Sequence, residues 1–424
     1  MNRAGDVVIT KKNEVFLHIR AEPHIEYELR DHFTFYVEGY KFMPQYRSKH
    51  WDGAIHLFDM RSKQIYVGLL DKIIAFCNRH DYSFSFEDNK YYGKPFEIND
   101  LISKEGVKDY MKAICSHSPR QYQIEGVYDA LKYNRKLLIS PTASGKSLMI
   151  YTLVRYYVDR GEKILLVVPT TSLVEQMYKD FQDYGWNAES YCHLIYAGKE
   201  KTNEYPVTIT TWQSVYKLDR KFFKEYSVAI GDEAHLFAAK SLSKIMESLT
   251  EVKYKIGTTG TLQETKTHKL QLEGMFGPAY FVTTSKELMD EGTLAKLNIQ
   301  ALVLSYCDEE RKLVSKMTYQ EEMDWIVRNE KRNAFIRNLV NSLKGNTLVL
   351  FQYVEKHGRP LYKTFSDLIA NDSTKRKVFF VFGGTDALDR EKVREIVEKE
   401  NDAIIVASFG TFSTGINIKR LHNV

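Results

Sequence analysis

Short apolar runs alternate with amphipathic segments along most of this chain, and their spacing predicts how the chain is organised. From residue 119 onward, apolar runs of strand length recur between segments of helical periodicity. We predict strands at Leu137–Ile139, Ile164–Val168, Tyr191–Tyr196, Val207–Thr211, Val228–Ile230 and Tyr254–Gly257. Helices are predicted between them, as at Leu148–Tyr157, Ser172–Tyr184 and Leu242–Leu249. Strands that alternate with helices form parallel sheets covered on both faces, so this stretch predicts an α/β domain.

A second alternating set begins near residue 297. Its predicted strands are Asn298–Tyr306, Thr347–Phe351, Val378–Phe382 and Ile404–Ala407, and its predicted helices are Phe335–Leu343, Leu361–Ala370 and Asp386–Glu400. We therefore expect an α/β domain over residues 113–285, a second over 295–424, and a hinge within Val282–Leu297. The charged residues 308–333 look helical and are most simply a solvated face.

The first 105 residues follow a different pattern. Strand-like runs and two helical segments predict a small α+β domain, with strands at Val7–Ile9, Val15–Ile19, Phe33–Val37 and Ile55–Phe58 and helices at Ile25–His32 and Leu69–Arg79. The polar stretch Asp88–Asp100 is its expected boundary.

Composition narrows the class of protein. The chain has 424 residues, 43% hydrophobic and 27% charged, which is ordinary for a globular protein of two or three domains. Its net charge of +5 is compatible with nucleic-acid binding but does not demand it. No apolar run reaches the length of a signal peptide or a membrane span, so we expect a cytoplasmic protein. The four cysteines lie far apart, which predicts small buried residues rather than a zinc site or disulfides.

The segment from Ser140 to Ser147, Ser-Pro-Thr-Ala-Ser-Gly-Lys-Ser, carries the strongest chemical signal. It follows an apolar strand and precedes a helix, which is the context of a phosphate-binding loop. Backbone N–H groups of such a loop surround nucleotide phosphates, here those of Thr142, Ala143, Ser144 and Gly145. Lys146 would contact the β- and γ-phosphates of ATP, and the Ser147 hydroxyl would bind Mg²⁺. Ser140 stands where the general pattern has its first glycine, and an ordinary strand–loop–helix corner is the alternative.

Asp232-Glu233-Ala234-His235 is the second strong signal, because an apolar strand delivers two adjacent carboxylates at its carboxyl end. Downstream of a phosphate loop, we assign Asp232 to Mg²⁺ and Glu233 to polarising the attacking water. On its own, this tetrapeptide is usually a solvated turn. His235 has no second His or Cys at ligand spacing, so a hydrogen-bonded link to the ATP site is a better assignment than a metal ligand.

Together with these two motifs, further segments make the chain resemble a superfamily-two helicase over about residues 117–424. The matching segments are Pro119–Gln123, Val168–Gln176, Thr210–Ser214, Thr259–Thr261, Leu348–Phe351, Phe382–Gly384 with Asp389–Glu391, and Ala407–Asn417. The resemblance implies two RecA-like domains with ATP between them. It also implies nucleotide contacts at Arg120, Gln123, Gly415 and Asn417, and coupling of hydrolysis to nucleic acid through His235, Thr259 and Thr261. Nucleic-acid backbone contacts are implied at Thr170, Thr171, Thr211, Gln213, Ser408 and Thr414, although a turn or helix cap is a serious alternative for each.

Four further segments resemble the phage UvsW type of recombination and repair helicase: Glu38–Pro44 with Trp51–Gly53, Val282–Lys286 with Leu288–Gly292, Tyr319–Glu322 and Phe409–Gly415. This resemblance implies a 3′→5′ motor that remodels branched DNA, namely forks, Holliday junctions and R-loops. Other recombination or replication proteins are possible partners. An RNA helicase, a restriction motor subunit or a nucleotide-gated module that binds branched DNA remain alternatives.

The segment Tyr40–Trp51 interleaves basic and aromatic residues. Arg47 and Lys49 could hold phosphates while Trp51 stacks on a base. In the alternative, the aromatic side chains are core and the charges form a solvated rim. The helicase family has a further arginine-containing motif shortly after Ala407–Asn417. Since this sequence ends at Val424 without it, we expect either that the coding frame continues or that ATP hydrolysis is slow.

Overall fold

The computed structural model describes residues 5–87, 89–95, 97–196, 204–238, 240–262, 266–296, 298–370, 376–385, 387–412, 418 and 420–424. The chain divides into two compact units, Met1–Leu297 and Asn298–Val424. Within the described ranges, no helix is long and apolar enough to cross a membrane.

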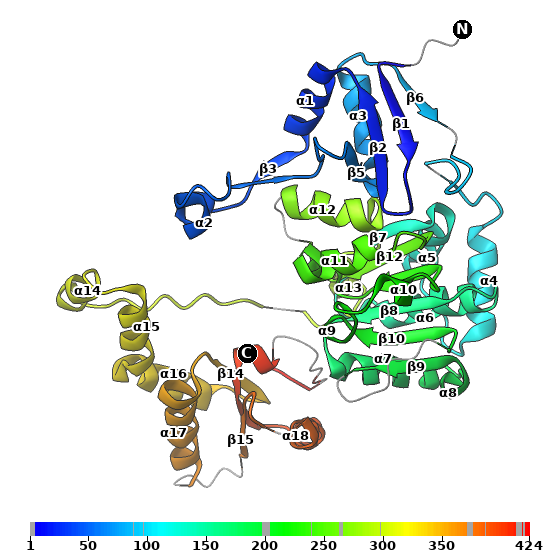
Figure 1. Ribbon diagram of the computed structural model, residues 1–424. Helices are drawn as coiled ribbons and strands as arrows, with labels where there is room; N and C mark the ends of the chain where they lie inside the picture. Colours follow the sequence, from blue (N-terminus) through cyan, green and yellow to red (C-terminus); the bar gives the residue numbers. More distant parts are fainter. Residues whose placement is uncertain are drawn as a thin grey trace. The chain divides into compact units, whose positions relative to one another are not determined.

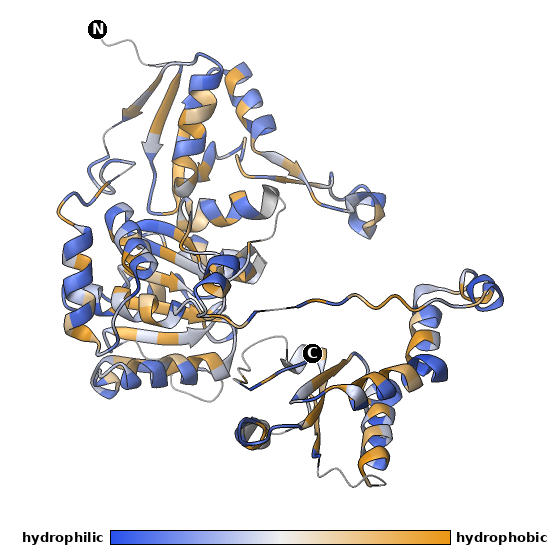
Figure 2. Cartoon of the chain, turned by 180° about the vertical axis from the view of Figure 1, so that it is seen from behind, coloured by the Kyte–Doolittle hydropathy of each residue, from blue (hydrophilic) through white to orange (hydrophobic). Residues whose placement is uncertain are grey.

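The amino-terminal part of the first unit is a four-stranded sheet in the order β5-β2-β1-β6. The strands are β1 (Val7–Lys11), β2 (Phe16–Ala21), β5 (Gln64–Tyr66) and β6 (Phe84–Glu87), and the helices are α1 (Pro23–His32) and α3 (Leu70–Arg79), the latter preceded by the 3₁₀ turn η2 (Val67–Leu69). Apolar residues of the sheet and both helices form one buried core. In Figure 2 the strands of this sheet are coloured largely as hydrophobic.

A two-stranded arm leaves this domain (Figure 1). It consists of β3 (Thr34–Tyr36) paired antiparallel with β4 (Ala54–His56), the 3₁₀ turn η1 (Tyr40–Phe42) and the short helix α2 (Pro44–Arg47). Neither η1 nor α2 contains a buried residue. The tip of the arm therefore presents its side chains to solvent, whereas Phe35 and Ile55 of its two strands pack against the domain core.

The rest of the first unit contains a seven-stranded parallel sheet in the order β13-β7-β12-β11-β8-β10-β9. Its strands are β7 (Arg135–Ile139), β8 (Ile164–Val168), β9 (Cys192–Ile195), β10 (Val207–Thr211), β11 (Val228–Gly231), β12 (Tyr254–Thr259) and β13 (Ala279–Phe281). The helices and turns are α4 (Lys104–Ile114), α5 (Gln121–Tyr133), α6 (Lys146–Val158), α7 (Thr171–Asp183), α8 (Ala188–Tyr191), α9 (Trp212–Val215), α10 (Arg220–Phe223), η3 (Ala234–Ala238), α11 (Lys240–Ser248), α12 (Lys266–Phe276) and α13 (Ser285–Asp290).

Helices cover both faces of this sheet. Since successive strand residues point to opposite sides, neighbours on one strand enter different cores. Leu138 packs into one core with α4 to α7, whereas its neighbours Leu137 and Ile139 pack into a second core with α11 and α12. A strand buried on both faces needs continuous apolar sequence, which is why these runs could be recognised as strands.

The second unit has a three-stranded parallel sheet in the order β14-β16-β15, also with a core on each face. Its elements are α14 (Asp308–Val314), α15 (Tyr319–Arg328), α16 (Glu330–Ser342), β14 (Thr347–Phe351), the π-helical turn η4 (Val354–Gly358), α17 (Arg359–Ala370), β15 (Val378–Val381), α18 (Ala387–Lys399), β16 (Ile404–Ser408) and α19 (Phe409–Phe412). The predicted fold class, two parallel-sheet domains and a small α+β domain, is confirmed.

Two sequence predictions are wrong. The segment Asn298–Tyr306 is not a strand, because no described strand pairs with it. Its side chains are largely exposed, with Ile299 at 80% and Val303 at 88%. Apolar β-prone residues form a strand only when a neighbouring strand supplies hydrogen bonds. Cys307 is also exposed rather than buried, since it precedes α14 at the surface.

The first half of the predicted hinge is packed within the first unit. Val282 and Leu288 are both buried, and α13 occupies the middle of the segment. By contacts, the boundary between the units falls after Leu297, and the amino-terminal domain joins the first unit. The limits that the sequence suggested at residues 105, 113, 285 and 295 stay predictions.

His357 makes the stability of the second unit depend on pH. It is 6% exposed in η4, and neither ring nitrogen bonds a described group. Burial, aided by Arg332, lowers the pKa of His357 from 6.5 to about 4. The unfolded chain therefore binds more protons between these values, so the free energy of unfolding falls as pH drops from 6.5 to 4, by about 2–3 kcal/mol at most.

We expect His357→Leu to flatten this dependence. Urea unfolding of the full chain at a series of pH values measures how the free energy of unfolding depends on pH. Hydrogen exchange of β14 amides reports the same dependence within the second unit. His24→Leu is the matched control, because the His24 side chain is 60% exposed. Equal slopes for wild type and His357→Leu would show that His357 is not the titrating group.

Candidate active site

The loop from Ser140 to Gly145 joins β7 to α6 at the carboxyl edge of the parallel sheet, where ligands bind in such folds. Ala143 (φ 66°) and Gly145 (φ 81°) take the left-handed conformation. The φ of Gly145 favours glycine, and a Cβ there would lie 2.3 Å from Gln123 Nε2, so a larger residue would also displace that amide. Ser140 is fully buried; its N–H donates to Thr259 O (2.8 Å) and its Oγ lies 2.6 Å from Ser144 Oγ. Serine is therefore accommodated where the general pattern has glycine.

Several backbone donors of this loop have no partner in the described part of the chain. The N–H groups of Thr142, Ala143, Gly145, Lys146 and Ser147 form no hydrogen bond with any described residue. They lie at the positive end of the α6 dipole. Unpaired N–H groups at a helix start form a ready anion site, so the loop fits the phosphates of a nucleotide.

The predicted catalytic residues converge on this loop, although β12 lies between the strands that carry them. Lys146 Nζ donates to Glu233 Oε1 at 3.0 Å. Asp232 is 7% exposed, and its Oδ1 accepts from the Thr258 hydroxyl at 2.8 Å. Glu233 has a φ of 49°, unusual for a residue with a side chain, and this conformation accompanies its pairing with Lys146.

The two adjacent carboxylates differ in acidity. The hydrogen bond from His235 and the charge of Lys146 together lower the pKa of Glu233 to about 2, against the effect of burial. Burial raises the pKa of Asp232, with Lys146 opposing it. Glu233 is therefore firmly ionised in the nucleotide-free protein, while the Asp232 carboxylate lies in a site that a cation would stabilise.

The predicted coupling residues also lie together. His235 Nδ1 lies 2.9 Å from Thr259 Oγ1 and 3.4 Å from Glu233 Oε2. The Thr259 hydroxyl donates to Thr261 O at 2.8 Å. A Cβ on Gly260, between them, would be 3.5 Å from Lys146 Nζ. One hydrogen-bonded chain therefore links the lysine, the glutamate and the end of β12.

The Gln123 side chain connects the Ser140–Gly145 loop to the start of α5. Its Nε2 donates to Ser144 O at 2.9 Å, and its Oε1 accepts from the backbone N–H of Arg120 at 2.9 Å. The Tyr122 hydroxyl also donates to Ser144 O at 3.1 Å and accepts from Arg120 Nη1 at 2.7 Å. Sequence reasoning missed Tyr122, although its place beside Gln123 in the same motif was an available signal.

Ser147 is half-buried in the first turn of α6, beside Asp180 of α7. Burial raises the pKa of Asp180, and a hydrogen bond from Ser147 lowers it. Sequence reasoning missed Asp180, because nothing near it in the chain marks it. A serine hydroxyl and a carboxylate are oxygen groups of the kind that Mg²⁺ prefers, so the residue types of Ser147 and Asp232 suit the predicted ion.

The nucleic-acid candidates of the first unit lie at the ends of two adjacent strands, since Thr211 of β10 pairs with Val168 of β8. The Thr170 hydroxyl caps α7 by accepting from Leu173 N at 3.3 Å, and Thr211 Oγ1 lies 2.9 Å from Ser214 Oγ. Thr171 and Gln213 are exposed. The two exposed residues are free to meet a ligand, whereas Thr170 already serves as a cap.

In the second unit, Ser408 ends β16, with its Oγ 2.5 Å from Thr411 Oγ1. Thr414, Gly415 and Asn417 lie outside the described residues.

On the arm, Arg47, Lys49 and Trp51 line a hollow of about 500 Å³. Both cations are exposed, and half-buried Trp51 donates its Nε1–H to Ala54 O at 2.8 Å. The ring of Tyr40 stacks on Tyr36 (centroids 4.9 Å apart) and meets Tyr46 edge-on (4.8 Å). The rings of Tyr36, Tyr40 and Tyr46 therefore pack on one another, whereas Phe35 of β3 packs against the domain core.

Comparison with known protein families gives two matches. A family described as "DNA helicase UvsW, N-terminal" matches residues 6–87. A family described as "Type III restriction enzyme, res subunit" matches residues 116–264.

Similar proteins include the ATP-dependent DNA helicase uvsW of Enterobacteria phage T4, which is 35% identical over 422 residues, covering 96% of this chain and 82% of that protein. The DNA 3′-5′ translocase XPB2 of Sulfurisphaera tokodaii is 26% identical over 193 residues, covering 46% of this chain and 42% of that protein. Among solved structures, the crystal structure of T4 UvsW superposes with a TM-score of 0.60 at 31% identity, covering 98% of this chain and 83% of that one.

Proposed function

The chain belongs to the UvsW family of ATP-dependent DNA helicases, and from this premise we propose that it remodels branched DNA during recombination and repair. Forks, Holliday junctions and R-loops are the proposed substrates, and 3′→5′ is the proposed direction of movement. Other recombination or replication proteins are its proposed partners. The similar translocase named for 3′-5′ movement supports the direction.

One observation carries the proposal of an ATP-driven cycle: Lys146 and Glu233 pair at 3.0 Å beside a loop in which several N–H groups bond no described residue. When the triphosphate of ATP binds these groups, its charge competes with Glu233 for Lys146. Transfer of the lysine to the phosphate removes a positive neighbour from Glu233, so the pKa of the carboxylate rises and it becomes a better base for water.

Magnesium fits the same site. Asp232 and Ser147 would hold Mg²⁺, which would neutralise phosphate charge as ATP is split. We assign Thr142 to Gly145 to the phosphates and Gln123 and Arg120 to the adenine side. For the second unit, we assign Gly415 and Asn417 to the nucleotide.

His235, Thr259 and Thr261 would transmit the state of Glu233 to the end of β12, through the hydrogen bonds at 3.4, 2.9 and 2.8 Å. DNA would be held by Thr171, Gln213 and Thr211, with Thr170 as the cap that positions its helix. Ser408 and Thr414 would contact the same strand. Contacts of this kind hold the sugar–phosphate backbone and carry no sequence preference.

Glu233→Gln tests the proposed chemistry. We expect the variant to bind ATP normally and to hydrolyse it about 10²-fold more slowly, because the amide cannot accept a proton from water. Phosphate release on forked DNA measures turnover, and a fluorescent ATP analogue measures affinity. Glu225→Gln makes the same charge change at a carboxylate paired with Lys163 (2.8 Å). Normal phosphate release by Glu233→Gln would remove the glutamate from the mechanism.

The arm is the proposed contact to the branch point. Two exposed cations and a half-exposed indole suit a phosphate backbone and an unstacked base. We expect Arg47→Ser combined with Lys49→Ser to weaken fork binding more than binding to single strands, and to lower the slope of log K against log salt by about two.

The matched control for the arm variant is Lys12→Ser with Arg79→Ser, which removes two exposed cations from the same domain outside the arm. Fluorescence anisotropy at several salt concentrations provides both slopes. If the control and the arm variant lose equal affinity, the effect is net charge and the arm has no particular role.

A further inference from the structure

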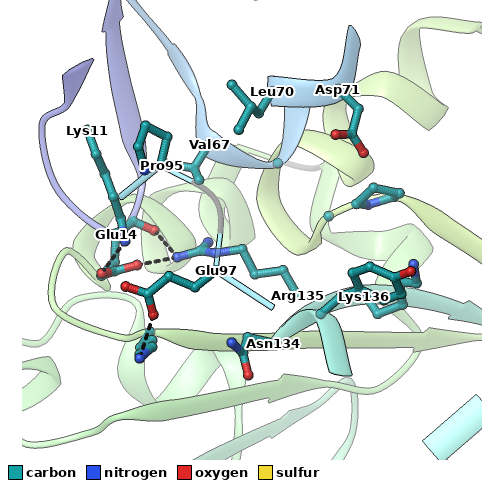
Figure 3. Close-up of a pocket in the computed structure, with 15 residues that line it drawn as sticks. Lys11, Glu14, Val67, Leu70, Asp71, Pro95, Glu97, Asn134, Arg135 and Lys136 are labelled. Carbon is teal, nitrogen blue, oxygen red and sulfur yellow. Dashed lines mark hydrogen bonds and ion pairs between the residues drawn. The ribbon is translucent and has the colours of Figure 1, made fainter. Parts of the chain in front are cut away.

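A cavity of about 230 Å³ lies where the amino-terminal domain meets the parallel sheet, far from the ATP loop (Figure 3). Its walls come from the β1–β2 turn, η2 and the segment around Glu97 on one side, and from the first residues of β7 on the other. β7 begins at Arg135 in this cavity and ends at Ile139 before the phosphate loop. The cavity therefore lies at the opposite end of the strand from the proposed ATP site.

The contact between the two domains is tight around the cavity. A Cβ on Gly68 of η2 would lie 2.0 Å from Glu273 O of α12. The Tyr66 hydroxyl donates to Glu247 Oε1 at 2.7 Å, and Glu14 N donates to Thr250 O at 2.9 Å. We call this contact region the joint.

Three cations at the joint, of which Lys11 and Lys255 are buried and Arg135 is half-buried, contact one buried glutamate, Glu14. The carboxylate of Glu14 pairs with Lys11 Nζ at 2.8 Å and with Arg135 Nη2 at 2.6 Å. The backbone carbonyl of Glu14 accepts from Arg135 Nη2 (2.9 Å) and from Lys255 Nζ (2.8 Å). Figure 3 shows Lys11, Glu14 and Arg135 converging at one side of the cavity. Glu97 lies beside them but is already paired with Lys253 at 2.7 Å.

The cluster consequently has a surplus of positive charge. Lys255 is 1% exposed, and its pKa lies well below the usual range because of burial and then the charge of Arg135. Burial also lowers the pKa of Arg135 and of Lys11. A buried surplus can be relieved by losing a proton or by gaining an anion.

We propose that this cavity is a binding site for a small free oxyanion of the phosphate class, held by Arg135 and Lys11. Both hydrogen bonds of Arg135 to described residues leave from Nη2, so its remaining N–H groups are available to an anion. The cavity exceeds the space of several waters, at about 30 Å³ each, and so has room for a tetrahedral oxyanion. A bound anion bridges β1 of one domain and β7 of the other, and so fastens the joint.

Inorganic phosphate is the probe, in the Lys146→Ala background so that the ATP loop does not contribute. We expect a saturable rise in melting temperature with phosphate at constant ionic strength. Adding Arg135→Gln should weaken phosphate affinity about tenfold, because a charged donor is lost while Glu14 keeps Lys11. Arg220→Gln, at an exposed position of α10, should leave the rise unchanged. No rise, or an equal rise in both variants, overturns the proposal.

Glu14→Gln gives the opposite sign and tests the same site independently. Glu14 competes with an anion for Lys11 and Arg135, so its removal should tighten phosphate binding and let phosphate restore stability. A purely structural role for Glu14 predicts no such rescue. Should Arg135→Gln fail to fold, crystals of Lys146→Ala grown with selenate test the site instead. Anomalous density in the cavity supports the proposal, and anomalous density only elsewhere overturns it. Loss of duplex DNA affinity without loss of phosphate affinity in Arg135→Gln would assign the cavity to DNA and also overturn it.

Discussion

Lys146→Ala should reduce DNA-stimulated ATP hydrolysis by about 10³-fold or to background, with the fold intact. The ammonium group is the only side-chain cation within 4 Å of Glu233 among described residues apart from His235. If the loop binds ATP as proposed, this ammonium group would balance the charge that develops on the phosphates. Loss of one preorganised charged donor at such a site costs about 10²–10³-fold, and weaker nucleotide binding adds to it. Phosphate release at saturating ATP on a forked DNA measures the effect.

The fold should survive this change because Lys146 contributes no core packing. The buried face of α6 begins at Leu148, and Glu233 keeps His235 when the lysine is removed. Lys163→Ala is the control, because Lys163, just before β8, pairs with Glu225 at 2.8 Å. Thermal unfolding of both variants should stay close to wild type. Wild-type hydrolysis by a folded Lys146→Ala protein would contradict the assignment of the loop to ATP.

The parts of this site that could be predicted are those whose residues are consecutive in the chain. Ser140 to Ser147 and Asp232 to His235 each follow a buried strand, so their residue types and their place at the carboxyl edge both follow from local sequence. The pairing of Lys146 with Glu233 was not predictable in this way. It depends on the strand order, in which β12 lies between β7 and β11.

The joint shows the limit of sequence reasoning more clearly. Glu14 is 121 residues from Arg135 and 241 from Lys255. Each of these residues alone is a charged side chain, which is normally exposed, and no spacing marks them as partners. The predicted strand at Asn298–Tyr306 was wrong for the converse reason, namely that a local signal was present but a described partner strand was not. Its composition favours a strand, but no described strand hydrogen-bonds with it.

Glu14→Gln should cost about 3–5 kcal/mol of unfolding free energy in phosphate-free buffer. The carboxylate is 6% exposed and is paired with Lys11 and Arg135, while Lys255 bonds the carbonyl of the same residue. Removing its charge while keeping its shape leaves three cations, two buried and one half-buried, facing one another without that carboxylate. Breaking a buried ion pair on one side is far more costly than losing a neutral hydrogen bond, because the remaining charge stays desolvated.

Glu247→Gln is the matched change at the joint, because the new amide oxygen can still accept from the Tyr66 hydroxyl. We expect it to cost no more than about 1 kcal/mol. Urea unfolding gives both values, and hydrogen exchange of β1 amides shows whether the amino-terminal sheet loosens first. Equal, small losses in the two variants would mean that the surplus charge at the joint is already relieved without Glu14. If only Glu14→Gln lowers the free energy of unfolding strongly, the packing of the amino-terminal domain on the seven-stranded sheet depends on this single carboxylate.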